Sequence, residues 1–315
     1  MTPNVAAAAV ETILVAFFAG GHALIEGVPG IGKTLIVRSL AEALNLSFNR
    51  IQFTVDLMPA DITGTRIINE GLDGRREFVF VRGPVFAHLL LADEINRATP
   101  KTQSALLEAM AEQQVTVAGT THPLPSPFFV LATLNPIEME GTYQLPEAQL
   151  DRFLFKLRVR YPALEELNAI IDRTTHATSA SVHRVMSGPN VMTFRELIRE
   201  VPVATHVRDL ASMIVMATHP EWDRSPEPAR RFVRYGASPR GAQALILGAK
   251  VRALAEGRYN VSVDDLKTLA APALRHRIIL NFEGEAEAVD IDSLIDDIVR
   301  SAETLVGQAK EPFLR

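Results

Sequence analysis

The sequence predicts an α/β protein in which a parallel, five-stranded sheet is followed by an all-helical domain. In the first half of the chain, short apolar runs alternate with helical patterns, as in a parallel sheet covered by helices on both faces. A glycine-rich stretch joins the first run to the first helix. After residue 162 the apolar residues recur at helical spacing. We therefore expect a core domain over residues 1–162 and a helical lid domain over residues 163–315.

The strands of the sheet are predicted at short runs that are apolar or rich in β-branched and aromatic residues. These runs are residues 22–26, 48–53, 89–92, 128–133 and 155–160. Helices are expected between them at residues 35–44 and 100–113. The second helix has two start signals, with Thr99 as its N-cap and Pro100 at its first position.

Two segments do not fit a simple alternation of strands and helices. Residues 66–81 contain two β-rich runs on either side of Gly71 and Gly74, and residues 115–124 contain two shorter runs around Ala118 and Gly119. Both predict β-hairpins inserted into the core. Such hairpins either carry contacts to other molecules or only cap the domain, and the sequence leaves both possibilities open.

The second half of the chain has several apolar faces at helical spacing, and two signals for helix starts. The faces lie within residues 164–171, 194–198, 210–217, 242–249 and 266–274. Thr193 with Glu196, and Ser262 with Asp265, fit the capping-box pattern at a helix start. Residues 174–190 are polar and are expected to form a mobile connector between helices.

The glycine-rich stretch fits the pattern G-x-x-x-x-G-K-[ST] of phosphate-binding loops. Glycines allow backbone N–H groups to surround a phosphate, and a following helix directs the positive end of its dipole at the anion. Lys33 is expected to reach the β- and γ-phosphates of ATP, and the Thr34 hydroxyl to hold Mg²⁺. A plain turn between strand and helix is the alternative. The predicted nucleotide-binding residues of this stretch are Gly27, Val28, Pro29, Gly30, Ile31, Gly32, Lys33, Thr34 and Leu35.

Two carboxylates follow the apolar run at residues 89–92, namely Asp93 and Glu94. Asp93 is expected to bind Mg²⁺ through its water ligands. Glu94, one residue further, is placed to polarise a water for attack on the γ-phosphate. Surface carboxylates that cap a turn are the alternative, since acidic residues at strand ends are common.

Three further residues are candidates for contact with the phosphate or the attacking water. Asn135 follows the next apolar strand, although an asparagine before a proline is also typical of a turn. Arg152 suits a phosphate, but Asp151 or Glu147 is an alternative local partner. Arg240 falls in the first turn of a predicted helix, which disfavours a cation unless an anion is bound or an acidic side chain pairs with it.

Composition narrows the function classes. The chain is 47% hydrophobic and 22% charged with a net charge of −5, which gives nucleic-acid binding no support from overall charge. It has no cysteine, so it forms neither a disulfide framework nor a thiolate metal site. We expect a cytoplasmic protein with no signal peptide and no membrane span.

His276 is expected to be structural. It lies between two arginines and has no second metal ligand at suitable spacing.

Together these motifs closely resemble the MoxR family of AAA+ ATPases. The resemblance covers most of residues 12–280 and is weakest in the connector and the last thirty-five residues. It is carried by residues 20–30, 56–64, 93–98, 102–110, 135–138, 141–143, 145–153, 236–240 and 274–277.

The resemblance implies a role for each candidate residue. Lys33 and Thr34 correspond to Walker A, and Asp93 and Glu94 to Walker B. Asn135 corresponds to sensor 1, Arg152 to the arginine finger and Arg240 to sensor 2.

The resemblance also implies an assembly and a type of activity. Relatives form homo-oligomeric, hexameric rings with ATP between subunits. They act as chaperones that remodel or activate other proteins, often with a von Willebrand factor A domain protein as partner, and some help to insert metal cofactors. The two predicted hairpins correspond to the helix-2 insert and the hairpin before sensor 1.

Two other functions are compatible with the same motifs. One is a nucleic-acid motor of the same clade, which the acidic charge balance and the few basic residues at the hairpin tips disfavour. The other is a nucleotide-dependent scaffold without hydrolysis, which the presence of Glu94 and Arg152 disfavours.

Overall fold

The computed structural model describes residues 5–27, 32–70, 76–135, 142–161, 163–175 and 182–309. The chain divides into two compact units, and neither is continuous in sequence. The first comprises Met1–Glu11, Leu24–Leu145 and Leu157–Met192, and the second Thr12–Ala23, Pro146–Lys156 and Thr193–Arg315. The expected domain boundary at residue 162 stays a prediction. The two units are defined by which residues pack together, and each is made of three separate segments of the chain.

The α/β core has the predicted five-stranded parallel sheet, in the order β2-β5-β8-β1-β9. The strands are β1 (Ala23–Gly27), β2 (Phe48–Gln52), β5 (Leu89–Asp93), β8 (Phe129–Leu134) and β9 (Phe155–Val159). All five predicted strands are therefore confirmed. Strands β5 and β8 are almost entirely buried, which explains why their sequences are continuous apolar runs.

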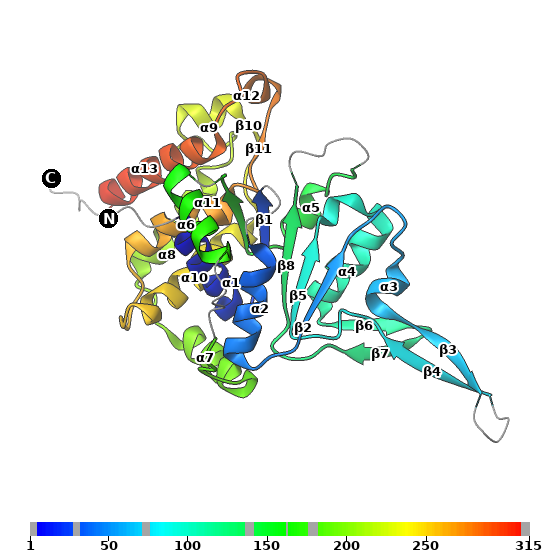
Figure 1. Cartoon of the computed structure of the whole chain (residues 1–315). Helices are drawn as coiled ribbons and strands as arrows, with labels where there is room; N and C mark the ends of the chain where they lie inside the picture. Colours follow the sequence, from blue (N-terminus) through cyan, green and yellow to red (C-terminus); the bar gives the residue numbers. More distant parts are fainter. Residues whose placement is uncertain are drawn as a thin grey trace. The chain divides into compact units, whose positions relative to one another are not determined.

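The helices of the first unit (Figure 1) are α2 (Lys33–Leu44), α3 (Pro59–Thr63), the 3₁₀ helix η1 (Ile95–Arg97), α4 (Pro100–Glu112) and α6 (Leu164–Thr175). The sequence predicts α2 and α4, and it predicts the apolar face of α6 as part of the lid, but it does not predict α3 or η1. The predicted start of α4 is confirmed, with Thr99 at the N-cap and Pro100 at the first position. Helix α2 is amphipathic and buries Val37, Ala41 and Leu44.

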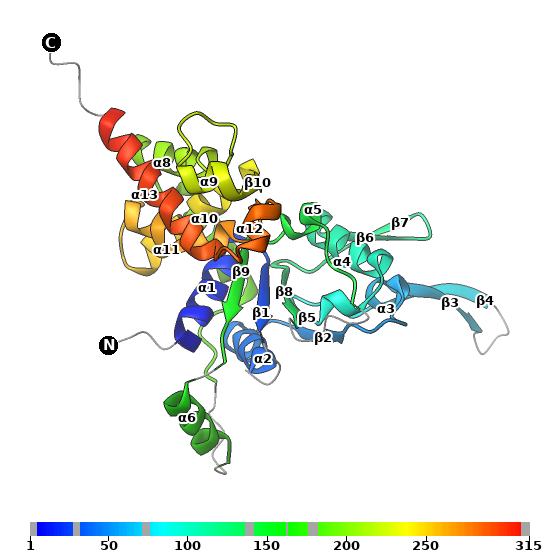
Figure 2. The ribbon, with the colours of Figure 1, turned by 90° about the horizontal axis from the view of Figure 1, so that it is seen from above.

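Both predicted hairpins are present. Strands β3 (Gly64–Glu70) and β4 (Arg76–Arg82) pair antiparallel, as do β6 (Gln114–Val117) and β7 (Thr120–Pro123). The first hairpin extends away from the sheet (Figure 2), while Gly71 and Gly74 of its expected turn lie outside the described residues. At its base, a Cβ on Gly64 would lie 2.2 Å from the carbonyl oxygen of Val81, so this close approach requires glycine.

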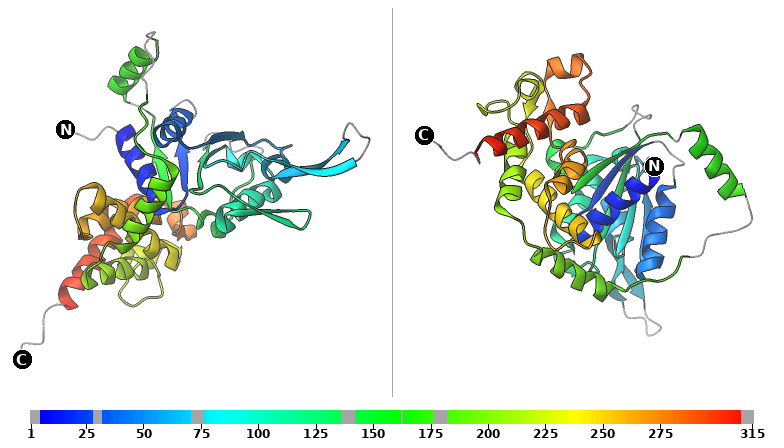
Figure 3. Two further views of the ribbon diagram at one scale, coloured as in Figure 1. Left: turned by 90° about the horizontal axis from the view of Figure 1, so that it is seen from below. Right: turned by 90° about the vertical axis from the view of Figure 1, so that its left-hand side faces the viewer.

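The second unit is mainly helical, as predicted for the lid, and Figure 3 shows its bundle from two sides. Helix α10 packs against α8 and α11, and α13 packs against both α8 and α11. Strands β10 (Val233–Tyr235) and β11 (Ile279–Leu280), which lie far apart in the sequence, pair antiparallel as a separate two-stranded sheet. The helices of this unit include α5 (Glu147–Leu150), α8 (Thr205–Met216), α9 (Glu227–Phe232), α10 (Pro239–Ala255), α11 (Val263–Leu274), α12 (Phe282–Ala286) and α13 (Ile291–Ala309).

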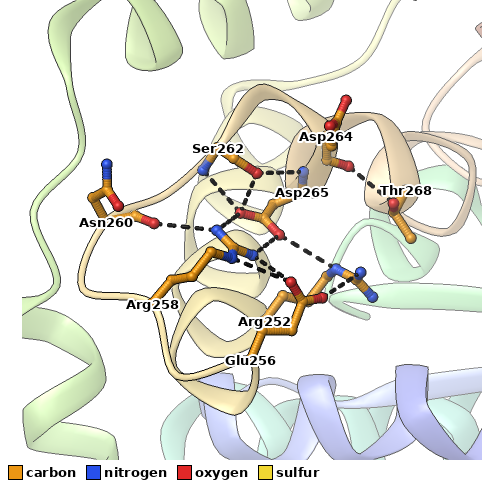
Figure 4. A network of polar contacts seen from close by, with 8 residues as sticks. All are labelled: Arg252, Glu256, Arg258, Asn260, Ser262, Asp264, Asp265 and Thr268. Carbon is orange, nitrogen blue, oxygen red and sulfur yellow. Dashed lines mark hydrogen bonds and ion pairs between the residues drawn. The ribbon is translucent and has the colours of Figure 1, made fainter.

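One predicted helix start is confirmed and the other is wrong. Ser262 and Asp265 form the expected capping box at the start of α11, within the polar network of Figure 4. Helix α7 (Gly188–Glu200), in contrast, begins at Gly188, so Thr193 lies inside it. Helix α7 therefore includes residues 188–190, the end of the expected connector.

Several helices were not predicted from the sequence, and the longest of them are α1 and α13. Helix α1 (Val5–Ala19) is apolar on all sides and lacks the polar stripe that marks an amphipathic helix. Helix α13 buries Ile295 and Ile298 completely and lies beyond the part of the chain with clear motifs. None of the helices within the described residues is both long enough and apolar enough to cross a membrane.

Candidate functional site

The carboxyl ends of neighbouring strands meet at one edge of the parallel sheet, where α/β proteins bind their ligands. Strands β2, β5, β8 and β1 are adjacent in that order, and Gln52 at the end of β2 pairs with Asp93 at the end of β5. A cavity of about 260 Å³ opens at this edge. It is lined by Gly32, Lys33, Thr34, Arg50, Gln52, Asp93, Glu94 and Asn135.

The described part of the phosphate-binding loop brings Lys33 into the cavity. Gly32 is the N-cap of α2 and has a φ of 79°, a left-handed conformation that favours glycine. The Lys33 ammonium donates a hydrogen bond of 2.8 Å to the Gly27 carbonyl, which directs its side chain back toward the end of β1. Burial lowers the pKa of Lys33, while the nearby carboxylates of Asp93 and Glu94 act in the opposite direction.

The other predicted residues of this loop fall into two groups. Thr34 lines the cavity beside Lys33, whereas the side chain of Leu35 is 67% exposed. Four residues predicted to bind the nucleotide lie outside the described residues, namely Val28, Pro29, Gly30 and Ile31.

Asp93 ends β5, and its carboxylate has two strong partners. Arg50 on β2 donates to one oxygen at 2.6 Å, and the Thr133 hydroxyl on β8 donates to the other at 2.6 Å. The flanking strands on both sides therefore fix the orientation of this carboxylate. A guanidinium against one oxygen also shows that this position suits a cation.

Glu94 begins a turn with a φ of 56°, an uncommon conformation for a residue with a side chain. Its backbone N–H donates to the Thr133 hydroxyl at 2.9 Å. Its carboxylate accepts a hydrogen bond of 2.8 Å from Gln52 and lies 3.1 Å from the Arg97 guanidinium. The left-handed turn directs Glu94 away from the strand, where it lines the cavity with Asp93.

Asn135 directly follows β8 and lines the same cavity. It is only 7% exposed, and a buried amide is expected to hold hydrogen-bond partners in a fixed geometry. The structure thus brings together five residues that are far apart in the sequence. They are Lys33, Thr34, Asp93, Glu94 and Asn135.

Three residues of this site were not identified from the sequence: Arg50, Gln52 and Thr133. Arg50 and Gln52 lie two residues apart on β2, so they face the same side of the strand. Only the pairing of β2 with β5 shows that this side meets Asp93 and Glu94. Thr133 could have been identified from the sequence, because it carries a hydroxyl near the end of an otherwise apolar strand.

The residues at the cavity fit a magnesium ion with a bound nucleotide. Mg²⁺ prefers oxygen ligands and is usually held by one or two protein groups, phosphates and water. Thr34 and Asp93 supply a hydroxyl and a carboxylate at this cavity. Over the described residues, no group of three or more His, Cys, Asp or Glu side chains could hold a metal by itself. The hydroxyl of Thr34 and the carboxylate of Asp93 therefore suit a Mg²⁺ that is bound together with the phosphates of a nucleotide.

The two predicted arginines lie in the second unit. Arg152 follows α5, its backbone N–H donates to the Gln149 carbonyl at 3.2 Å, and its side chain is exposed. Arg240 lies in the first turn of α10, whose N-cap is Ser238 as predicted. The acidic partner considered for Arg240 is present, because its guanidinium lies 3.5 Å from the Asp151 carboxylate.

His276 has the structural role that the sequence predicts. Its Nε2 lies 3.0 Å from the carbonyl oxygen of Phe153, and its side chain is buried. Burial first, and then the charge of Arg277, hold the pKa of His276 well below its ordinary value. The ring is therefore neutral, and its Nε2–H donates a hydrogen bond to the Phe153 carbonyl.

Residues 22–155 match the family model "ATPase family associated with various cellular activities (AAA)", and residues 229–298 match the AAA lid domain. The chain is 42% identical over 292 residues to chaperone MoxR1 of Mycobacterium tuberculosis, covering 93% of this chain and 76% of that protein. It is 30% identical over 311 residues to protein MoxR of Methylorubrum extorquens, covering 93% and 88%. A crystal structure from Cytophaga hutchinsonii, described as that of an ATPase, matches with a TM-score of 0.86 at 42% identity. That match covers 93% of this chain and 88% of the other.

Proposed function

Because the chain belongs to the MoxR family of AAA ATPases, we propose that it hydrolyses ATP to remodel, activate or assemble other proteins. One observation carries the proposal: a cation, two carboxylates and an amide meet in one cavity at the carboxyl edge of the sheet. A relative at 42% identity is named a chaperone, which supports the part of the proposal that the chain acts on other proteins.

ATP binding is assigned to the loop from Gly27 to Thr34 and to the start of α2. The N-terminus of α2 provides unpaired N–H groups and a positive dipole end for the phosphates. Lys33 adds a point charge, and its lowered pKa reflects burial that a bound phosphate would offset. Thr34 and Asp93 would hold Mg²⁺, which neutralises charge on the β- and γ-phosphates.

Hydrolysis is assigned to Glu94 and Asn135. Glu94 acts as the base that takes a proton from the attacking water, since its carboxylate is held at the cavity by Gln52. Asn135 orients that water or contacts the γ-phosphate. Thr133 supports both carboxylates, because one hydroxyl joins the side chain of Asp93 to the backbone of Glu94.

The two arginines are proposed to contact phosphate within a homo-oligomeric ring, by analogy with hexameric relatives. Arg152 would act on the nucleotide of a neighbouring subunit, and its exposed position supports that role. Arg240 would contact phosphate as sensor 2. A von Willebrand factor A domain protein is the proposed partner, and insertion of a metal cofactor into a client is one proposed outcome.

Phosphate release by the purified protein tests the proposal. Lys33→Ala removes the charge that holds the phosphates, so ATP affinity should fall by about 10- to 100-fold, the value of a hydrogen bond to a charged group. Arg38→Ala is the matched control, because Arg38 lies on the same helix, is exposed and pairs with Glu42. Hydrolysis that persists unchanged in Lys33→Ala would refute the assignment.

A further inference from the structure

The carboxylate of Asp151 gathers three side chains of the second unit. It accepts from the Arg277 guanidinium at 2.8 Å and from the Ser238 hydroxyl, which lies 2.9 Å from each of its oxygens. Arg240 lies 3.5 Å away. Asp151 also directly precedes Arg152 in the chain. One carboxylate is therefore linked to both arginines that the proposed function assigns to phosphate.

We propose that Asp151 is a positioning residue that competes with the phosphate of ATP for Arg240. The inference rests on the proposed function, because it requires Arg240 to contact the nucleotide. Asp151 would bind the Arg240 side chain while no phosphate is bound to that side chain. The strength of this contact would then determine how easily Arg240 moves from Asp151 to the phosphate of ATP.

The first support is that Asp151 cannot easily move. Its partner Arg277 has a side chain only 2% exposed. Arg277 also donates to the carbonyls of Phe153 at 2.7 Å, Leu154 at 3.1 Å and Asp151 itself at 3.2 Å, and to that of Ala273. The segment that carries Asp151 and Arg152 is thus fastened to the end of α11.

The second support is that Arg240 is held much less firmly. Its contact with Asp151 is the longest of the three, and its side chain is 55% exposed. An exposed ion pair contributes little to stability and is easily exchanged for another anion. A carboxylate and a phosphate oxygen offer a guanidinium the same kind of acceptor. Asp151 and a phosphate are therefore direct competitors for this side chain.

The third support is the place of the contact at the start of α10. Arg240 lies in the first turn, where the helix dipole disfavours a cation. Asp151 offsets that cost with a negative charge, and it also accepts from Ser238, the N-cap of the same helix. Arg240 consequently needs an anion beside it, and Asp151 supplies one until a phosphate replaces it.

A double-mutant cycle tests the inference with a fluorescent ATP analogue as the probe. Asp151→Asn keeps the size of the side chain and an oxygen acceptor but removes the competing charge. The affinity for the analogue should rise about two- to fivefold, the range that corresponds to an exposed ion pair. The rise should vanish when Arg240→Ala is also present, because no guanidinium is then left to compete for.

The control is Asp292→Asn, which breaks an ion pair of 3.0 Å with Arg275 in the same unit. It should lower the melting temperature without changing the affinity for the analogue. A purely structural role of Asp151 would change affinity equally with and without Arg240, and that result would overturn the inference. The proposed function would survive it, since ATP binding and hydrolysis by the unmodified protein are measured separately and do not depend on this competition.

Asp151→Asn leaves Arg277 buried without a counterion, so this variant is at risk of unfolding. In that case Arg277→Met is added, which removes the uncompensated charge. The affinity for the analogue is then compared between this double variant and the same variant that also carries Arg240→Ala. A gain in affinity that requires Arg240 supports the competition. No gain, or a gain that persists without Arg240, contradicts it.

Discussion

At the scale of single residues, Thr133 connects the two carboxylates of the site. Its hydroxyl donates to Asp93 at 2.6 Å and accepts from the backbone N–H of Glu94 at 2.9 Å. The side chain is completely buried, so water cannot replace these bonds easily. One hydroxyl thus helps to fix both the side chain of Asp93 and the backbone of Glu94.

Thr133→Val tests this role, because valine has nearly the same shape but no hydroxyl. Each lost bond involves a charged or buried group, so we expect turnover to fall by about 10- to 100-fold, as for hydrogen bonds to charged groups. Steady-state phosphate release measures the effect.

Thr102→Val is the matched control for this substitution. Thr102 is also buried and donates to the Leu57 carbonyl at 2.7 Å, but it does not line the cavity. It should lose about 1 kcal/mol of stability and little activity. Equal turnover in the two variants would contradict the role of Thr133.

At the scale of elements, an ion-pair network joins the end of α10 to the start of α11 (Figure 4). Asp265 is 2% exposed and accepts two hydrogen bonds from Arg258, at 2.7 and 2.9 Å. It also accepts from the backbone and hydroxyl of Ser262. Burial alone would raise the pKa of Asp265, but these donors outweigh it and hold the pKa below its ordinary value.

This lowered pKa makes stability depend on pH with a defined sign. The contribution of Asp265 is fully present above its unfolded pKa, near 3.8, and is lost as the pH falls through the lower folded value. Asp265→Asn should therefore cost about 1.5–3 kcal/mol at neutral pH, as expected for lost hydrogen bonds to charged groups. The difference from the unmodified protein should shrink below pH 4.

Urea unfolding at several pH values measures this difference. Asp264→Asn is the control, because Asp264 is the neighbouring residue on α11 and its side chain is 89% exposed. It should change stability little at any pH. A cost for Asp265→Asn that stays constant through the acid range would show that its charge is not responsible.

Most elements of the core could be predicted from the sequence, because buried strands and amphipathic helices leave local patterns. The strands β5 and β8 were found from continuous apolar runs, and α4 from its cap. Helix α1 was missed because its apolar residues surround the helix and give no periodic signal. Local patterns thus fail where apolar residues surround an element on every side.

The site was predictable only in part, for a different physical reason. Residues that follow a strand or begin a helix, such as Lys33 and Glu94, have local signals. Arg50 and Gln52 reach Asp93 and Glu94 only through the pairing of β2 with β5. Strand order is a long-range property, and periodicity within one strand does not contain it.

At the scale of the whole molecule, the proposal requires subunits to work together. The residues proposed to bind phosphate lie in the first unit and Arg152 in the second. An arginine supplied to a neighbouring subunit would make each site depend on two chains. Such an arginine contributes about 10³- to 10⁵-fold to the rate in related phosphoryl-transfer enzymes.

Mixing two inactive variants tests this dependence. Arg152→Ala subunits keep an intact phosphate-binding loop, and Lys33→Ala subunits keep the arginine. If Arg152 acts across subunits, mixed assemblies should recover part of the ATPase activity that neither variant has alone. Arg240 is unchanged in both. A mixture no more active than its two components would argue that Arg152 does not act in trans.

The most direct test of the central claim is a single-turnover measurement on Glu94→Gln. Glutamine keeps the size and an oxygen of the side chain but cannot act as a base. This variant should bind ATP with Mg²⁺ as tightly as the unmodified protein. Its rate of phosphate formation should be lower by about 10²- to 10⁴-fold, the range for a general base. Cleavage of bound ATP at the unmodified rate would contradict the account.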